Sequence, residues 1–122
     1  MEYDTILIVD DSKTSRLIVR RCLEMAGVGA SHVLEADDGT MALDILHDQT
    51  VSLIITDLKM PRMDGRTLVR QLRSRAETAD IPIVVVSSLA EGIDEDPIIG
   101  ENVLAAIQKP VSPTKFMEAL GA

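Results

Sequence analysis

Five side chains that suit metal and phosphate chemistry stand directly after short apolar runs of this sequence. In chain order they are Asp10, Asp11, Asp57, Ser87 and Lys109. Three carboxylates that lie together repel one another, and at least one would hold a proton at neutral pH unless a cation intervened. A divalent cation such as Mg²⁺ removes that conflict, because it binds carboxylate oxygens and keeps water molecules that a phosphate can replace. If these residues converge, they favour phosphoryl transfer.

Asp57 is the candidate nucleophile for such a transfer, because an ionised oxygen beside a cation can attack a phosphoryl group. Lys109 adds a positive charge for phosphoryl oxygens, and Ser87 can donate a hydrogen bond to the product phosphate. Taken singly, Ser87 is better interpreted as a turn residue and Lys109 as a solvated surface charge. Their joint placement with the aspartates, after four different strands, is what favours a shared site.

Helix capping is the alternative interpretation of a lone aspartate after a strand, because its carboxylate accepts hydrogen bonds from the first backbone N–H groups of a helix. Asp38 and Asp64, each beside a glycine at a predicted helix start, are interpreted as caps. Asp11 taken alone has the same interpretation.

The convergence of these side chains depends on the elements that carry them. Short β-branched runs alternate with longer segments of helical period. Strands are predicted over 5–9, 32–36, 51–56, 81–86 and 104–108, and helices over 13–26, 39–48, 64–75 and from Ser112-Pro113 onward. A helix within 90–102 is expected to be short, displaced or broken, because Pro97 and Gly100 interrupt that stretch.

Strict alternation of strands and helices predicts an α/β fold with a parallel sheet and right-handed crossovers. The leading topology is a flavodoxin-like, doubly wound, five-stranded sheet of order 2-1-3-4-5 with about five helices. Ligands of such sheets bind beyond the carboxyl ends of the strands, at the switch point between strands 1 and 3. The predicted inner helix faces are Ile18, Cys22 and Met25 in 13–26, Ala42, Ile45 and Leu46 in 39–48, and Leu68, Val69 and Leu72 in 64–75.

Composition excludes several other classes of protein. The 122 residues suit one domain, and 46% hydrophobic with 26% charged residues is a globular balance. No apolar run approaches the roughly 20 residues that span a bilayer, no secretory signal is visible, and a single cysteine suits a reducing cytoplasm. The net charge of -8 and the scarcity of aromatic residues, 2% of the chain, argue against direct nucleic-acid binding.

The chain resembles the receiver domain of two-component response regulators, of the stand-alone type found among chemotaxis regulators, over residues 1–122. The resemblance rests on four segments in the family's order and at similar spacing: Ile6-Leu-Ile-Val-Asp-Asp11, Asp57-Leu-Lys-Met-Pro-Arg-Met-Asp-Gly65, Pro82-Ile-Val-Val-Val-Ser87 and Lys109-Pro110. It implies a phosphorylation-dependent signalling switch rather than a turnover enzyme, in which Asp57 accepts a phosphoryl group from a histidine kinase or a histidine phosphotransfer protein.

The same resemblance implies a Mg²⁺ site. Asp11 and Asp57 would bind the ion directly, together with the backbone carbonyl of Lys59, whereas Asp10 would act mainly through a metal-bound water. Lys59 and Leu89 also occupy positions that in the family tune loss of the phosphoryl group. From them we predict a slowly hydrolysing acyl phosphate.

Ser87 and Lys109 complete the implied site. The hydroxyl of Ser87 would move toward the phosphoryl group and Lys109 would pair with one of its oxygens, and the bond from Lys109 to Pro110 is usually cis in the family. The sequence departs from the family at Ala106, where an aromatic residue often reports phosphorylation by rotating its ring. Output through a rotating ring at Ala106 is therefore excluded.

A basic face on helix 13–26 has two interpretations. One is an ordinary exposed surface, and the other is a docking face for the phosphodonor, as this helix often provides in the family. Its members are Lys13, Arg16, Arg20 and Arg21.

Two other functions compete with the receiver switch. A receiver used only for protein contacts, without phosphorylation, would need none of the site residues that this chain carries. A haloacid-dehalogenase-like phosphohydrolase would need Asp-x-Asp-x-Thr after the first strand, where this chain has Asp10-Asp11-Ser12-Lys13-Thr14. The length also leaves no room for the cap domain of such enzymes.

Overall fold

The computed structural model describes residues 2–88 and 103–121 of the chain. They contain one parallel sheet of order β2-β1-β3-β4-β5, which confirms the predicted topology. Its strands are β1 (Glu2–Val9), β2 (Gly29–Ala36), β3 (Leu53–Asp57), β4 (Ile83–Ser87) and β5 (Ala105–Gln108). The helices in these ranges are α1 (Lys13–Met25), α2 (Gly39–Asp48), α3 (Gly65–Arg73) and α4 (Pro113–Leu120). The helix expected within 90–102 lies outside the described residues.

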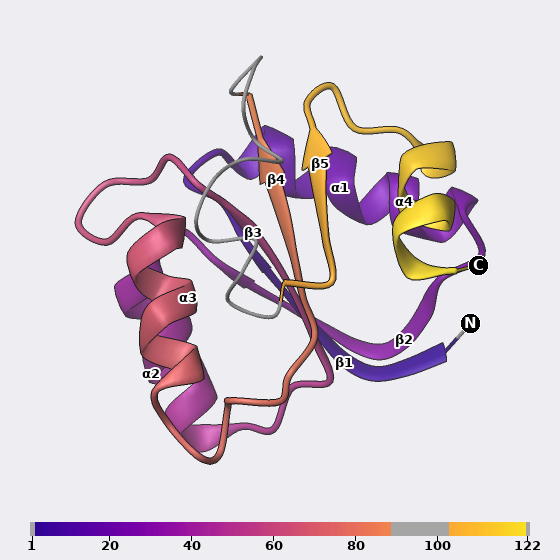
Figure 1. Ribbon diagram of the computed structural model, residues 1–122. Coiled ribbons are helices and arrows are strands. Elements are labelled where there is room, and N and C mark those ends of the chain that lie inside the picture. Colours follow the sequence, from indigo (N-terminus) through magenta and orange to yellow (C-terminus); the bar gives the residue numbers. More distant parts are fainter. Residues whose placement is uncertain (1, 89–102, 122) are drawn as a thin grey trace.

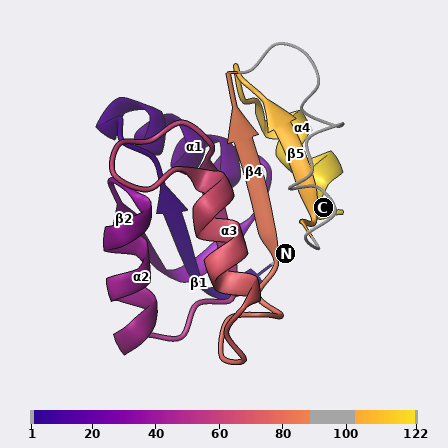
Figure 2. The same ribbon diagram turned by 60° about the vertical axis from the view of Figure 1, so that its left-hand side comes forward.

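The sheet lies between two helical layers, with α1 and α4 over one face and α2 and α3 over the other (Figures 1 and 2). Alternate residues of a strand point to opposite faces. Ile6 and Ile8 accordingly join the core beneath α1 and α4, while Leu7 and Val9 join the core beneath α2 and α3. Because both faces are covered, all residues of β3 and β4 are buried, which accounts for the unbroken apolar runs in the sequence.

Each described helix begins at a side-chain cap. The N-cap residues are Ser12, Asp38, Asp64 and Ser112, and each side chain accepts a hydrogen bond from a backbone N–H of the first turn. This confirms the capping interpretation of Asp38 and Asp64. For Asp11 that interpretation was wrong, because the preceding loop ends on Ser12, and Asp11 lies outside the helix.

The predicted inner face of α1 was wrong at two of its three positions. Cys22 is buried as expected, but Ile18 is 47% exposed and Met25 is 75% exposed. Val19 and Leu23 take their place in the core. Apolar residues occupy more than one stripe of this helix, so spacing alone allows two overlapping faces, and contact with the sheet selects between them.

The inner face predicted for α3 is confirmed, because Leu68, Val69 and Leu72 are fully buried. Among the described helices, none is both long enough and apolar enough to cross a bilayer.

Candidate functional site

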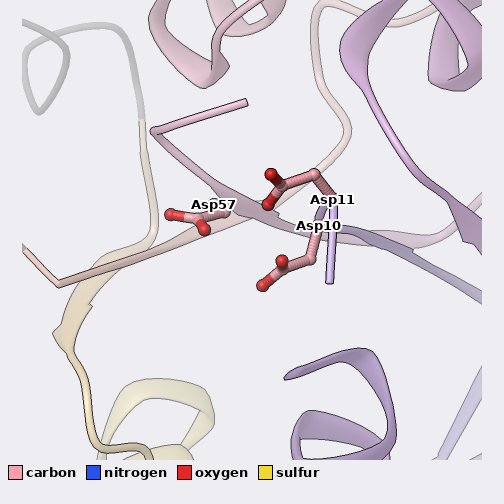
Figure 3. Close-up of side chains that lie close together, drawn as sticks. All are labelled: Asp10, Asp11 and Asp57. Atoms are coloured by element: carbon pink, nitrogen blue, oxygen red, sulfur yellow. The ribbon is translucent and has the colours of Figure 1, made fainter. Parts of the chain in front are cut away.

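Three carboxylates gather at the carboxyl edge of the sheet. Val9 of β1 pairs with Thr56 of β3, so the next residues along the two strands, Asp10 and Asp57, emerge side by side. One carboxylate oxygen each from Asp10, Asp11 and Asp57 lies within 4.8 Å of the others. Figure 3 shows the three side chains grouped at the ends of their strands. The sequence predicted this convergence from topology, and the structure has it.

Lys109 brings a positive charge to this cluster from the loop after β5. Its Nζ lies 3.2 Å from Oδ2 of Asp10 and 3.1 Å from Oδ2 of Asp57. Burial alone would lower the pKa of Lys109, but hydrogen bonds and charges from Asp57 and Asp10 outweigh it and raise that pKa above its ordinary value. The ammonium is therefore fully charged at neutral pH. The bond from Lys109 to Pro110 is cis, as the resemblance implies.

The two oxygens of Asp57 have different partners. Oδ1 accepts hydrogen bonds from the backbone N–H groups of Leu58 at 2.7 Å and Lys59 at 3.4 Å, while Oδ2 faces Lys109. Asp57 is only 7% exposed. Its carboxylate is thus buried and held in one orientation at the carboxyl edge of the sheet, with an oxygen directed at a cation.

Ser87 lies at the same edge, one strand further along the sheet. Its neighbour Val86 pairs with Asp57, and Ser87 itself pairs with Gln108 and is buried. The backbone N–H of Lys109 donates to the carbonyl oxygen of Ser87 at 2.8 Å, which fixes the loop carrying the lysine. The structure therefore places Ser87 and Lys109 on adjacent strand ends.

Lys59 belongs to the loop between β3 and α3, and it lines an open pocket of about 530 Å³ together with Asp11. The other lining residues are Leu58, Met60, Pro61, Asp64 and Arg66. The candidate site is therefore reached from solvent on the side of this loop. Leu89, the other position predicted to affect hydrolysis, lies outside the described residues.

Gly65 is a structural requirement of the site to which sequence reasoning gave no role. A Cβ atom added at Gly65 would lie 2.1 Å from the backbone oxygen of Asp57 and 2.9 Å from Cα of Leu58. The backbone N–H of Gly65 donates to the carbonyl oxygen of Leu58 at 2.9 Å. The chain thus turns back onto the residue after Asp57, and a side chain at Gly65 would displace it. The sequence did contain a signal for this role, because Gly65 ends the segment from Asp57 that carries the family resemblance.

Arg16 is a second residue whose role was missed, since it was assigned to the exposed basic face. Its Nη1 donates to the backbone oxygen of Asp10 at 2.6 Å, and its Nε donates to Glu35 at 2.8 Å. The side chain is only 14% exposed. Arg16 therefore ties the end of β1 to β2, while Lys13, Arg20 and Arg21 remain exposed.

The charge balance of the site suits a divalent cation. Three carboxylates face one ammonium, so two negative charges are uncompensated among these groups when all are ionised. Carboxylate oxygens are the donors that Mg²⁺ prefers, and the exposure of Asp11 leaves one side of the cluster open to solvent. The residues present therefore fit a magnesium site.

Comparison with known proteins agrees with this geometry. The family model described as "Response regulator receiver domain" matches residues 6–121. A chemotaxis protein CheY homolog of Campylobacter jejuni is 34% identical over 116 residues, covering 94% of this chain and 88% of that protein. The sensor histidine kinase CheAY of Helicobacter pylori is 32% identical over 109 residues, which cover 88% of this chain but 13% of that protein.

Solved structures show the same fold. The chemotaxis response regulator CheY4 of Vibrio cholerae has a TM-score of 0.81 at 26% identity, with 97% of this chain and 96% of that chain covered. A response regulator receiver protein from Pseudomonas putida has a TM-score of 0.81 at 29% identity, with coverage of 97% and 95%. The chain belongs to the response regulator receiver domain family of two-component signal transduction.

Proposed function

We propose that this protein is a phosphorylation-dependent switch that accepts a phosphoryl group on Asp57 and thereby changes its binding to a partner. The observation that carries the proposal is the grouping of Asp10, Asp11 and Asp57 within 4.8 Å, with the ammonium of Lys109 3.1 Å from Asp57. If Lys109 formed a buried ion pair only to stabilise the fold, one carboxylate would be enough. A third, exposed carboxylate and an adjoining open pocket are features of a site that receives a charged ligand.

Asp11, Asp57 and the backbone carbonyl of Lys59 would hold Mg²⁺ directly, and Asp10 would hold it through a water molecule. When bound, the ion neutralises the negative charge that the incoming phosphoryl group brings to the aspartates. Lys59 stands on the loop that borders the same pocket as Asp11, which supports its inclusion.

The transfer itself requires an ionised oxygen on Asp57. That oxygen forms a bond to phosphorus while the bond from phosphorus to the donor imidazole nitrogen breaks, and the imidazole departs with the electron pair and takes up a proton. Lys109 then pairs with an oxygen of the new aspartyl phosphate, and the hydroxyl of Ser87 donates to another. These new contacts bias the loops that carry Ser87 and Lys109 toward a second arrangement.

The phosphodonor is proposed to be a histidine kinase or a histidine phosphotransfer protein. The similarity to a segment of the sensor histidine kinase CheAY supports this, because that protein joins a kinase to a segment like this chain. On α1, Lys13, Leu17 and Arg20 line an exposed groove near the site, which we propose as the docking face. No direct contact with nucleic acid or membrane is proposed, and the signalling is assigned to the cytoplasm.

Mass spectrometry of the intact protein after incubation with acetyl phosphate and Mg²⁺ tests the proposal. We expect a gain of one phosphoryl group, which is absent in Asp57→Ala and after prior addition of a chelator. Asp44→Asn, at an exposed aspartate on α2, is the matched control and should be phosphorylated normally. A wild-type protein that gains no phosphoryl group would instead support a receiver-like scaffold that works without phosphorylation.

The lifetime of the aspartyl phosphate is a further part of the proposal. Lys59 places an exposed cation beside the pocket, where it can attract the phosphoryl oxygens and hinder the approach of water. We therefore expect slow hydrolysis, and a faster release of inorganic phosphate from phosphorylated Lys59→Ala. Release at the same rate from both proteins would remove Lys59 from this role.

A further inference from the structure

The loop between β3 and α3 contains an arginine in an unusual backbone conformation. Arg62 has a φ of 65°, the left-handed region that L residues with side chains rarely adopt. It follows Lys59, Met60 and Pro61, which line the pocket beside Asp11. A residue held in this conformation indicates that contacts of the surrounding structure determine the course of the loop.

The guanidinium of Arg62 reaches across to the start of α2. Its Nε and Nη2 both contact Oδ2 of Asp38, and Nη2 lies 3.7 Å from Oδ1 of Asp37. Asp38 is only 1% exposed, and its other oxygen caps α2 by accepting from the N–H of Met41 at 2.8 Å. The hydrogen bond from Met41 and the contact with Arg62 lower the pKa of Asp38 against the effect of burial. Asp38 therefore presents a buried negative charge to Arg62.

The next residue of the loop contacts the same helix start. A Cβ atom added at Gly39 would lie 2.8 Å from Cγ of Met63, so the Met63 side chain packs directly on the first turn of α2. Most exposed ion pairs contribute little, but a buried carboxylate that loses its cation is strongly disfavoured. The contact between Arg62 and Asp38 belongs with the buried pairs, because the Asp38 carboxylate is buried although the Arg62 side chain is 64% exposed.

We propose that Arg62 is a positioning residue that clamps the β3–α3 loop to Asp38 at the start of α2 and thereby sets the affinity of the site for Mg²⁺. The clamp fixes the middle of a loop whose ends are already fixed by Leu58, which is buried, and Gly65, which donates to the Leu58 carbonyl. Lys59 lies between the buried end and the clamp. This inference rests on the proposed function, because Lys59 is there assigned to the metal site.

Titration calorimetry with MgCl₂ tests the clamp with two complementary variants. Arg62→Gly suits a φ of 65° but removes the guanidinium. Asp38→Asn keeps Arg62 and an acceptor for the N–H of Met41, but removes the charge that holds the arginine. We expect each variant to raise the Kd for Mg²⁺ about threefold to tenfold, a smaller effect than loss of a residue that orients a metal ligand directly. Because both substitutions break the same contact, the double variant should bind Mg²⁺ no more weakly than the weaker-binding of the two single variants.

The sign of the change for Arg62→Gly separates the clamp from simple electrostatics. Removal of a positive charge from the loop that borders the site would by itself strengthen binding of a cation, whereas loss of the clamp weakens it. Arg75→Ala, an exposed arginine beyond the far end of α3, is the matched charge control and should leave the Kd unchanged. An unchanged or lowered Kd in Arg62→Gly overturns the proposal.

Amide hydrogen exchange of the metal-free protein gives a second measurement that does not depend on the metal. Both Arg62→Gly and Asp38→Asn should increase exchange in residues 59–63 and leave the strands unchanged. Unchanged exchange overturns the clamp even if the metal affinity falls. If the wild-type protein binds no Mg²⁺ but both variants show the increased exchange, the clamp stands and the metal site of the proposed function is wrong.

Discussion

The ammonium of Lys109 lies 3.1 Å from Oδ2 of Asp57, although 52 residues separate them in the chain. The same ammonium is 3.2 Å from Asp10, so one cation partly compensates two buried carboxylates. This arrangement directs an oxygen of Asp57 at a positive charge, and it places the ammonium where a phosphoryl group bonded to Asp57 under the proposed function would meet it.

Lys109→Met is expected to destabilise the metal-free protein, because Asp10 and Asp57 then face each other without the ammonium. We expect a loss of about 1–3 kcal/mol in the free energy of unfolding. Under the proposed function, Mg²⁺ should restore most of this loss by supplying the missing positive charge. Urea titrations in EDTA and in MgCl₂ measure both effects.

The exposed Lys13 offers the control for that experiment. Lys13→Met removes the same charge but leaves no buried carboxylate without its cation. It should therefore change the free energy of unfolding little in either buffer. Equal destabilisation of Lys109→Met with and without Mg²⁺ would contradict the idea that the ammonium and the metal ion compensate the same carboxylates.

Gly65→Ala should disturb Asp57 although the substitution lies eight positions away. The new Cβ would meet the backbone of Asp57 at 2.1 Å, and backbone atoms cannot yield as the end of a side chain can. We expect a loss of about 1–3 kcal/mol in the free energy of unfolding and slower phosphorylation by acetyl phosphate. Gly29→Ala is the control, because the atoms nearest to its Cβ would be those of the side-chain carboxyl of Glu2, which can move aside. Normal phosphorylation of Gly65→Ala would show that the loop adapts.

Arg16 and Arg20 should behave differently in phosphotransfer, although the sequence placed both on one basic face. Arg16→Gln loses a hydrogen bond to the backbone of Asp10, so it should slow phosphorylation by acetyl phosphate and by a histidine donor alike. It should also lower the free energy of unfolding by about 1–2 kcal/mol. Arg20→Glu, at an exposed position, should slow transfer from the protein donor alone.

Initial rates with the two donors, measured by intact mass, decide this prediction. Equal slowing of Arg20→Glu with both donors would remove α1 as a docking face. An Arg16→Gln protein that is phosphorylated normally by acetyl phosphate would show that the backbone of Asp10 needs no support from Arg16.

The order of the strands and the convergence of the aspartates could be predicted because both follow from local patterns. The carboxyl ends of parallel strands lie at one edge of the sheet, so residues at or just after the ends of β1, β3, β4 and β5 meet there. The start of β1 was predicted too late, at Thr5 rather than Glu2. The added residues, which include Glu2 and Tyr3 opposite Gly29 and Ala30, are not a continuous apolar run. These residues of β1 pair only with the edge strand β2, and their sequence has no apolar pattern that would predict a buried strand.

The positions of Arg16 and Arg62 could not be predicted, because each depends on a partner distant in sequence. Glu35 is 19 residues from Arg16, and Asp38 is 24 residues from Arg62. An arginine in a polar stretch has the same local signal whether it is solvated or paired. Only the packing of α1 and of the β3–α3 loop against the ends of β2 and α2 distinguishes the two cases.

The charge of Asp64 predicts how stability depends on pH. The backbone N–H of Thr67 lowers the pKa of this carboxyl, and Arg66 and Arg70 act in the same direction against partial burial. Since the folded pKa lies below the unfolded value of about 3.9, the stabilisation is complete above that value and is lost as the pH falls through the folded pKa. Asp64→Asn keeps the cap without the charge. Its difference from wild type in urea titrations should be constant down to about pH 5 and shrink below about pH 4. A difference unchanged at about pH 3, or shared by the exposed control Asp44→Asn, would refute this assignment.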